Sequence, residues 1–223
     1  FDTDATPDAN YMLSSDYTWL WWGWGTADVS SGNLHLTGGP DPIWGGYSNV
    51  VSIDEFTDPE IEIHPTNALI ATRLKFTTNA TSTSFATLVT FIAMDPDYLS
   101  NSNFYYTFVA PGLFGGINYA SGNGIIDTTS VIGYDQYFWQ VIAMDGDTVS
   151  VWVLPDTAEV IPDEPNIMFT INLVTDVVEP LESLVFLAAT NYDSSTVHID
   201  QVYYSTLDDF DDSEFEYAGS FGE

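Results

Sequence analysis

The chain has 223 residues, and its 33 acidic residues against two basic ones give a formal net charge of −31. This charge excludes binding to nucleic acids and to anionic membrane surfaces, because both draw affinity from lysine and arginine. The absence of cysteine excludes disulfide bonds, thiolate zinc sites and cysteine nucleophiles. Since 45% of the residues are hydrophobic, the chain still has enough apolar material for a folded core.

Short apolar segments rich in valine, isoleucine, threonine and aromatic residues alternate with clusters of Gly, Pro, Asn, Asp and Ser. This pattern is typical of β-strands. No stretch keeps a helical period, so the sequence predicts an all-β fold. In chain order, the predicted strands are Thr18–Trp24, Asn33–Thr37, Tyr47–Ile53, Ile61–His64, Leu69–Phe76, Phe85–Met94, Phe104–Ala110, Gly116–Tyr119, Tyr137–Met144, Thr148–Leu154, Ile167–Leu173, Leu184–Thr190 and Val197–Ser205.

Alternation within these strands predicts which side chains face the core. In the segment 69–76 the apolar residues take every second position, which places Arg73 and Lys75 together on the opposite face. The dipeptide Asp145-Gly146 predicts a tight hairpin. Near Asp200 the apolar phase slips by one residue, which predicts a β-bulge that re-aims its carboxylate. The glycine clusters at 115–116 and 122–124 are predicted to be turns.

The chain has no internal repeat or linker, so residues 1–205 are predicted to form one domain. Residues 206–223 form an acidic tail with spaced aromatics, which either docks on its own domain or a neighbouring copy or stays solvated. Arg73 and Lys75, as the only two basic residues, are the one place where a neighbour's acidic tail could find positive charge.

Several motifs occur in a familiar order: an opening Phe1-Asp2-x-Asp4, the Trp- and Gly-rich segment 19–25, Ser-Gly-Asn-Leu-His-Leu at 31–36, Phe-Tyr-Tyr-Thr-Phe at 104–108 and Val-His-Ile-Asp-Gln-Val-Tyr-Tyr at 197–204. Together they resemble the concanavalin A-like lectin/glucanase superfamily, particularly its laminin-G-like modules. The resemblance implies a jelly-roll sandwich of two antiparallel sheets. It also implies a structural Ca²⁺ and roles in sugar binding, glycan cleavage or adhesion.

The carbohydrate-cleaving branch of that superfamily uses two or three carboxylates on one strand face. Here Glu60 and Glu62 have strand spacing, but Pro65 stands where the third acid belongs. The pattern is incomplete, so the chain is not expected to be an enzyme. The three histidines, His35, His64 and His198, are widely separated in sequence and are each expected to face solvent or a neighbouring strand.

Three kinds of binding or modification site are expected. Flat aromatic faces suit sugar rings, so the predicted carbohydrate-binding residues are Trp21, Trp24 and Trp152, unless both faces of their strands are buried. The resemblance implies that acids near the two ends of the domain converge on Ca²⁺, and the predicted ligands are Asp2, Asp4 and Asp200. Asn79 begins the N-glycosylation sequon Asn-Ala-Thr.

The function first predicted is a secreted, non-enzymatic structural or adhesive subunit of an extracellular filament, sheath or surface layer. Such a protein would self-assemble into a homo-oligomer or polymer and would be stabilised by Ca²⁺ or high salt, because uncompensated acids repel one another. The alternative is a carbohydrate-binding, lectin-like module at the cell surface or outside it. A glycoside hydrolase is the third hypothesis, and it depends on Glu60 and Glu62.

Overall fold

The computed structural model describes residues 12–13, 17–22, 26–31, 33–37, 47–56, 67–78, 85–92, 105–118, 123–170, 185–191 and 195–208. These residues form fifteen strands and no helix. In the same part of the chain there is accordingly no helix long and apolar enough to cross a membrane.

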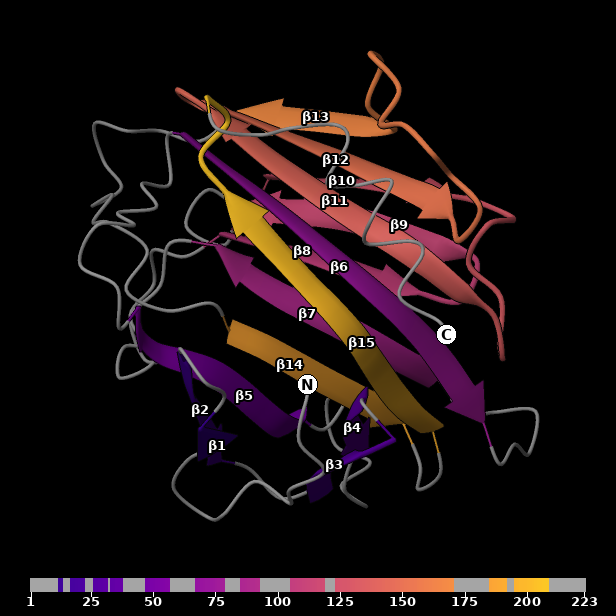
Figure 1. Ribbon diagram of the computed structural model, residues 1–223. Coiled ribbons are helices and arrows are strands. Elements are labelled where there is room, and N and C mark those ends of the chain that lie inside the picture. Colours follow the sequence, from indigo (N-terminus) through magenta and orange to yellow (C-terminus); the bar gives the residue numbers. More distant parts are fainter. Residues whose placement is uncertain are drawn as a thin grey trace.

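The strands make two antiparallel sheets stacked as a sandwich (Figure 1). The eight-stranded sheet has the order β1 (Met12–Leu13), β2 (Tyr17–Trp22), β5 (Tyr47–Phe56), β14 (Val185–Asn191), β7 (Phe85–Ile92), β8 (Tyr105–Ala110), β9 (Leu113–Asn118) and β10 (Asn123–Thr128). The seven-stranded sheet has the order β13 (Ile167–Thr170), β12 (Thr148–Pro155), β11 (Tyr137–Asp145), β6 (Asn67–Thr78), β15 (Ser195–Ser205), β4 (Asn33–Thr37) and β3 (Thr26–Ser30). This arrangement confirms the predicted all-β jelly roll.

The main core lies between the two sheets, and among the described side chains it is built from alternate residues of strands such as β4, β6, β12 and β15. β6 contributes Ile70, Leu74 and Phe76, and Phe76 stacks on Phe138 of β11 with ring centroids 5.8 Å apart. One polar group crosses this core. The side-chain amide nitrogen of Gln140 on β11 donates to a threonine hydroxyl of β8, and its amide oxygen accepts from a threonine hydroxyl of β7. The two sheets are therefore joined by directed hydrogen bonds as well as by apolar contact.

Two predictions from alternation are confirmed. Ile70, Leu74 and Phe76 are buried between the sheets, and Arg73 and Lys75 lie on the outer face of the seven-stranded sheet. The register of β15 against β6 shifts between Ile199 and Gln201, so Asp200 stands at a bulge.

Three strands were not predicted from the sequence: β1, β3 and β10. The prediction of a turn at 115–116 is wrong, because both glycines lie inside β9. A Cβ atom on Gly115 would come within 2.7 Å of the Phe108 ring, and one on Gly116 within 2.2 Å of the Phe169 ring. Glycine is required at both positions because these rings pack against the strand, and at Gly115 a Cβ atom would lie closer still, 2.5 Å, to the carbonyl oxygen of Ile125. Asn123 and Gly124 likewise begin β10, and the predicted strand Ile61–His64 lies outside the described residues.

Candidate functional site

A row of side chains crosses the outer face of the seven-stranded sheet, one from each of four neighbouring strands. In the strand registers His35 of β4 stands opposite His198 of β15, His198 opposite Lys75 of β6, and Lys75 opposite Tyr137 of β11. The residues on both sides of His35, Lys75 and His198 point into the core, as does Phe138 after Tyr137, so these four side chains point outward, and all four are half-buried. We call these four residues the polar row.

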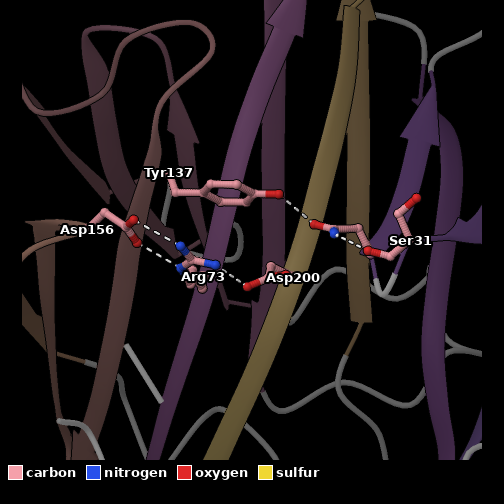
Figure 2. Close-up of polar contacts among 6 residues, drawn as sticks. Ser31, Arg73, Tyr137, Asp156 and Asp200 are labelled. Atoms are coloured by element: carbon pink, nitrogen blue, oxygen red, sulfur yellow. Dashed lines mark hydrogen bonds and ion pairs between the residues drawn. The ribbon is translucent and has the colours of Figure 1, made fainter. Parts of the chain in front are cut away.

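Arg73 lies two residues along β6 from Lys75 and joins two carboxylates (Figure 2). Its Nε donates to Oδ1 of Asp156 at 2.7 Å, and its Nη2 donates to Oδ2 of Asp156 at 2.9 Å. Its Nη1 donates to Oδ2 of Asp200. The bulge in β15 places Asp200 beside Arg73, and Asp156 follows the end of β12, so one guanidinium connects three chain segments.

Tyr137 connects this ion-pair cluster to the polar row. The guanidinium carbon of Arg73 lies 4.2 Å from the centroid of its ring, and Nζ of Lys75 lies 4.5 Å from the same centroid. Its hydroxyl donates to Oδ1 of Asn33 at 2.7 Å, and the amide of Asn33 donates to the carbonyl oxygen of Ser31 at 3.0 Å. Figure 2 shows this chain of contacts reaching from Asp156 to the turn at Ser31. Side chains from both halves of the sheet are therefore fixed relative to one another.

The two histidines of the polar row touch each other. Their ring centroids are 4.4 Å apart in an edge-to-face arrangement. Nε2 of His198 is hydrogen-bonded to Oγ1 of Thr77 at 2.8 Å, and Nδ1 of His35 to Oγ of Ser30 at 3.4 Å. The two histidines are far apart in sequence, but the antiparallel pairing of β4 and β15 brings their rings together, so each faces a neighbouring strand as expected.

The polar row and the ion-pair cluster of Arg73, Asp156 and Asp200 are together balanced in charge, although the chain as a whole is strongly acidic. Arg73 and Lys75 carry two positive charges, and Asp156 and Asp200 carry two negative ones. The hydrogen bonds that Arg73 donates to Asp156 and Asp200, together with the negative charges of both carboxylates, outweigh burial, raise the pKa of Arg73 and keep it ionised. Burial raises the pKa of Tyr137, and the nearby carboxylate of Asp200 raises it further, so the ring keeps its hydroxyl proton.

This balance bears on the prediction that a neighbour's acidic tail could find positive charge at the two basic residues. The side chain of Arg73 is only 17% exposed, and both of its carboxylate partners belong to its own chain. Arg73 is therefore already paired within its own chain, and binding of a neighbour's tail stays a prediction. The start of the predicted tail also lies on its own domain, since the backbone N–H of Leu207 donates to Oδ1 of Asn67 at 3.0 Å.

Next to the ion-pair cluster, over β11 and β12, the outer face of the seven-stranded sheet is apolar. Trp139, Val141 and Leu154 are buried there, with Trp152 packed against them. The indole nitrogen of Trp152 donates to the carbonyl oxygen of Pro162 at 2.8 Å, so the segment after β12 holds this ring at the edge of the apolar area. Trp152 thus lies on the same face as the polar row. The side chain of Trp21 and all of Trp24 are outside the described residues.

The other predicted sites are only partly placed. Asp200 is engaged by Arg73, while Asp2 and Asp4 lie outside the described residues, so the calcium site stays a prediction. Within the described ranges, no three His, Asp or Glu side chains are close enough to share a metal ion. The carboxylate pair Glu60 and Glu62 and the predicted glycosylation residue Asn79 lie outside the described residues.

Sequence reasoning missed Asp156, Tyr137 and Asn33 as members of this site. Tyr137 lies on the outer face next to buried Phe138, but β11 is buried on both faces over most of its length, so its sequence shows no alternation that would single Tyr137 out. Asp156 carries no signal either, because it stands after the end of β12 and its position depends on how the following loop returns over the sheet.

No family model matches the sequence, and no curated protein matches it either. Similar solved structures include the Bacillus licheniformis β-glucanase, with 10% identity, a TM-score of 0.56 and coverage of 92% of this chain and 99% of that one. The carbohydrate-binding module CBM66 from Bacillus subtilis has 12% identity and a TM-score of 0.50, with 87% and 99% covered. The binding domain of botulinum neurotoxin DC in complex with SialylT has 10% identity and a TM-score of 0.56, with 97% of this chain and 49% of that one covered.

These likenesses define the class of fold. The chain has the concanavalin A-like jelly roll of lectins and glucanases, as its resemblance to that superfamily predicts. Because the identities are only about one residue in ten, these structures show which fold the chain has but not its activity. The activity has to be inferred from this chain's own residues.

Proposed function

We propose that this chain is a non-catalytic glycan-binding module and that the polar row with its ion-pair cluster is the binding surface. The proposal rests on one observation: both basic residues of the chain lie with two of its three histidines on one half-buried patch of one sheet face. In a chain that otherwise carries mainly acids, such a concentration of varied polar groups indicates a site for a ligand rather than a solvated surface.

The patch has the chemistry that sugar recognition requires. Sugar hydroxyls both donate and accept hydrogen bonds, and the patch offers a donor in Lys75, amide groups in Asn33 and imidazoles that can do either. The contacts of Tyr137 with Arg73, Lys75 and Asn33 fix several of these side chains in advance. Side chains that are already ordered lose less conformational entropy when a ligand binds.

The charges favour a neutral glycan. The two positive charges of the patch are matched by Asp156 and Asp200, and the rest of the chain is acidic. A uronic or sialic acid carboxylate would meet no unmatched positive charge and would be repelled by the overall field. Neutral hexose chains avoid this cost.

At this patch, binding is favoured over hydrolysis because of how Asp156 and Asp200 are used. A glycosidase needs one carboxylic acid to protonate the leaving oxygen and one carboxylate to attack or to activate water. Asp156 and Asp200 both accept hydrogen bonds from Arg73, which commits them to an ion pair. The names of the similar structures, which include glucanases and a carbohydrate-binding module, support a carbohydrate role better than the filament role that the sequence first predicted. A module of this kind would act on glycans outside the cell or at its surface.

A glycan array followed by calorimetry with the best neutral oligosaccharide tests the proposal. Lys75→Gln and Asn33→Ala each remove a polar group of the patch and should weaken binding by about tenfold, or about 1.4 kcal/mol. The matched control is Asp145→Asn, which changes an exposed residue at the other end of β11 from Tyr137, roughly 26 Å away. Control affinity should equal that of the unaltered chain. An array without neutral glycan binding, or binding untouched by both site variants, would refute the proposal.

A further inference from the structure

The strand β10 ends the eight-stranded sheet among the strands that the structure describes, and it is unusually apolar for an edge. Ile125 is 40% exposed and Ile126 is 61% exposed. Because neighbouring residues of a strand point to opposite faces, β10 presents an isoleucine on each side of the sheet. Gly124, Asp127 and Thr128 of the same strand are exposed as well.

This edge has a regular backbone. β10 pairs with β9 along its whole length, from Asn123 opposite Asn118 to Thr128 opposite Leu113, without a register shift. The peptide groups on its other side therefore have the spacing that a further antiparallel strand needs.

Edge strands of soluble proteins are commonly protected from pairing by lysine, proline or a bulge. β10 has none of these, and its only charged residue is Asp127. The chain from Tyr98 to Ile126 contains no charged residue at all, although the protein as a whole has 33 acids in 223 residues. The three strands at this end of the sheet, β8, β9 and β10, therefore carry a single charge, that of Asp127, in a strongly negative chain.

We propose that β10 pairs antiparallel with β10 of a second copy of this chain around a two-fold axis, so that the two eight-stranded sheets continue into one another. A second copy is the favoured occupant for two reasons. An antiparallel edge is complementary to itself, and two copies that each carry a charge of −31 repel least where their facing strands have few acids. The isoleucines would be partly buried against their counterparts, which supplies the apolar gain.

This dimer should have a distinctive dependence on salt. Pairing brings two negative molecules together, and raising the ionic strength from 0.15 M to 1 M shortens the screening length from about 8 Å to about 3 Å. The dimer should therefore tighten as NaCl is added, whereas an interface held by ion pairs would loosen. The inference does not depend on glycan binding, because β10 belongs to the other sheet from the polar row.

The test is analytical ultracentrifugation of the full chain in 0.15 M and 1 M NaCl, at protein concentrations up to about 1 mM so that a weak dimer is populated. The unaltered chain should dimerise, more strongly at high salt. Ile126→Asp should weaken the dimer at least tenfold. The matched control is Val160→Asp, which adds the same charge at a side chain of similar exposure, 58% against 61%, in the loop after β12. Circular dichroism checks that both variants are folded.

Three results would overturn the inference: a monomer under all these conditions, a dimer that survives Ile126→Asp, or equal weakening by Val160→Asp. The last two would show self-association through another surface or through general charge.

Discussion

Replacing Arg73 with methionine removes the guanidinium that joins β6, β15 and the segment after β12, and keeps the apolar length of the side chain. The cost follows from the exposure of the groups left behind. Arg73 and Asp200 have side chains that are 17% and 18% exposed, while Asp156 is 35% exposed. Removing one partner of a fully buried pair costs about 3–5 kcal/mol, and exposed pairs contribute about 0–1 kcal/mol. The Asp200 contact lies nearer the first limit and the Asp156 contact nearer the second, so Arg73→Met should lower the free energy of unfolding by about 2–4 kcal/mol.

Urea unfolding at constant ionic strength measures this loss, with Lys75→Met as the matched control. The control removes the same unit of positive charge, and the contact that it gives up among the described residues is the cation–π contact with Tyr137, worth about 0.5–1 kcal/mol. In the Arg73→Met background, Asp200→Asn should recover about 1–2 kcal/mol, because it removes the carboxylate left without its cation. A loss below about 0.5 kcal/mol for Arg73→Met, or one equal to that of Lys75→Met, would refute the reasoning that Arg73 ties the three segments together.

Three further predictions concern the core, the tyrosine and a packed glycine. Gln140→Met leaves two buried threonine hydroxyls without their amide partner and should cost about 1–3 kcal/mol in urea unfolding; a neutral result would contradict a bond between the sheets. The pKa of Tyr137 is raised above its ordinary value of 10.0, so its contribution to stability is complete below that pH and falls as the pH rises toward the folded-state value. The difference between the tyrosinate absorbance titrations of the unaltered chain and Tyr137→Phe should have its midpoint above pH 10.0, and a lower midpoint would count against burial of the ring. Gly116→Ala places a Cβ atom 2.2 Å from the Phe169 ring and should cost about 1–3 kcal/mol; Phe169→Leu should relieve most of this loss, and no relief would exclude the clash as its cause.

The fold and one half of the candidate site could be predicted because they depend on local pattern. The alternation of β6 gave the outward face of Arg73 and Lys75, and the phase slip at Asp200 gave the bulge in β15. Both signals are periods of two residues, which a single sequence carries directly. The prediction of a jelly roll likewise follows from short strands together with the order of the family's motifs.

The other half of the site depends on pairing between distant segments. His35 and His198 meet only because β4 and β15 are neighbours, and Tyr137 reaches Asn33 across two intervening strands. No local pattern encodes such neighbours. β10 was missed for a different reason: Asn123 and Gly124 have the composition of a turn, but pairing with β9 keeps them extended.

The central claim, that the patch around Arg73 and Lys75 binds a neutral glycan, can be tested most directly by nuclear magnetic resonance. The chain has one arginine and one lysine, so labelling each amino acid isotopically gives a single side-chain signal from within the proposed site. Titration with the neutral oligosaccharide that binds best should shift both signals, with the same saturation curve that calorimetry gives. A ligand that binds by calorimetry and leaves both signals unmoved would contradict the account.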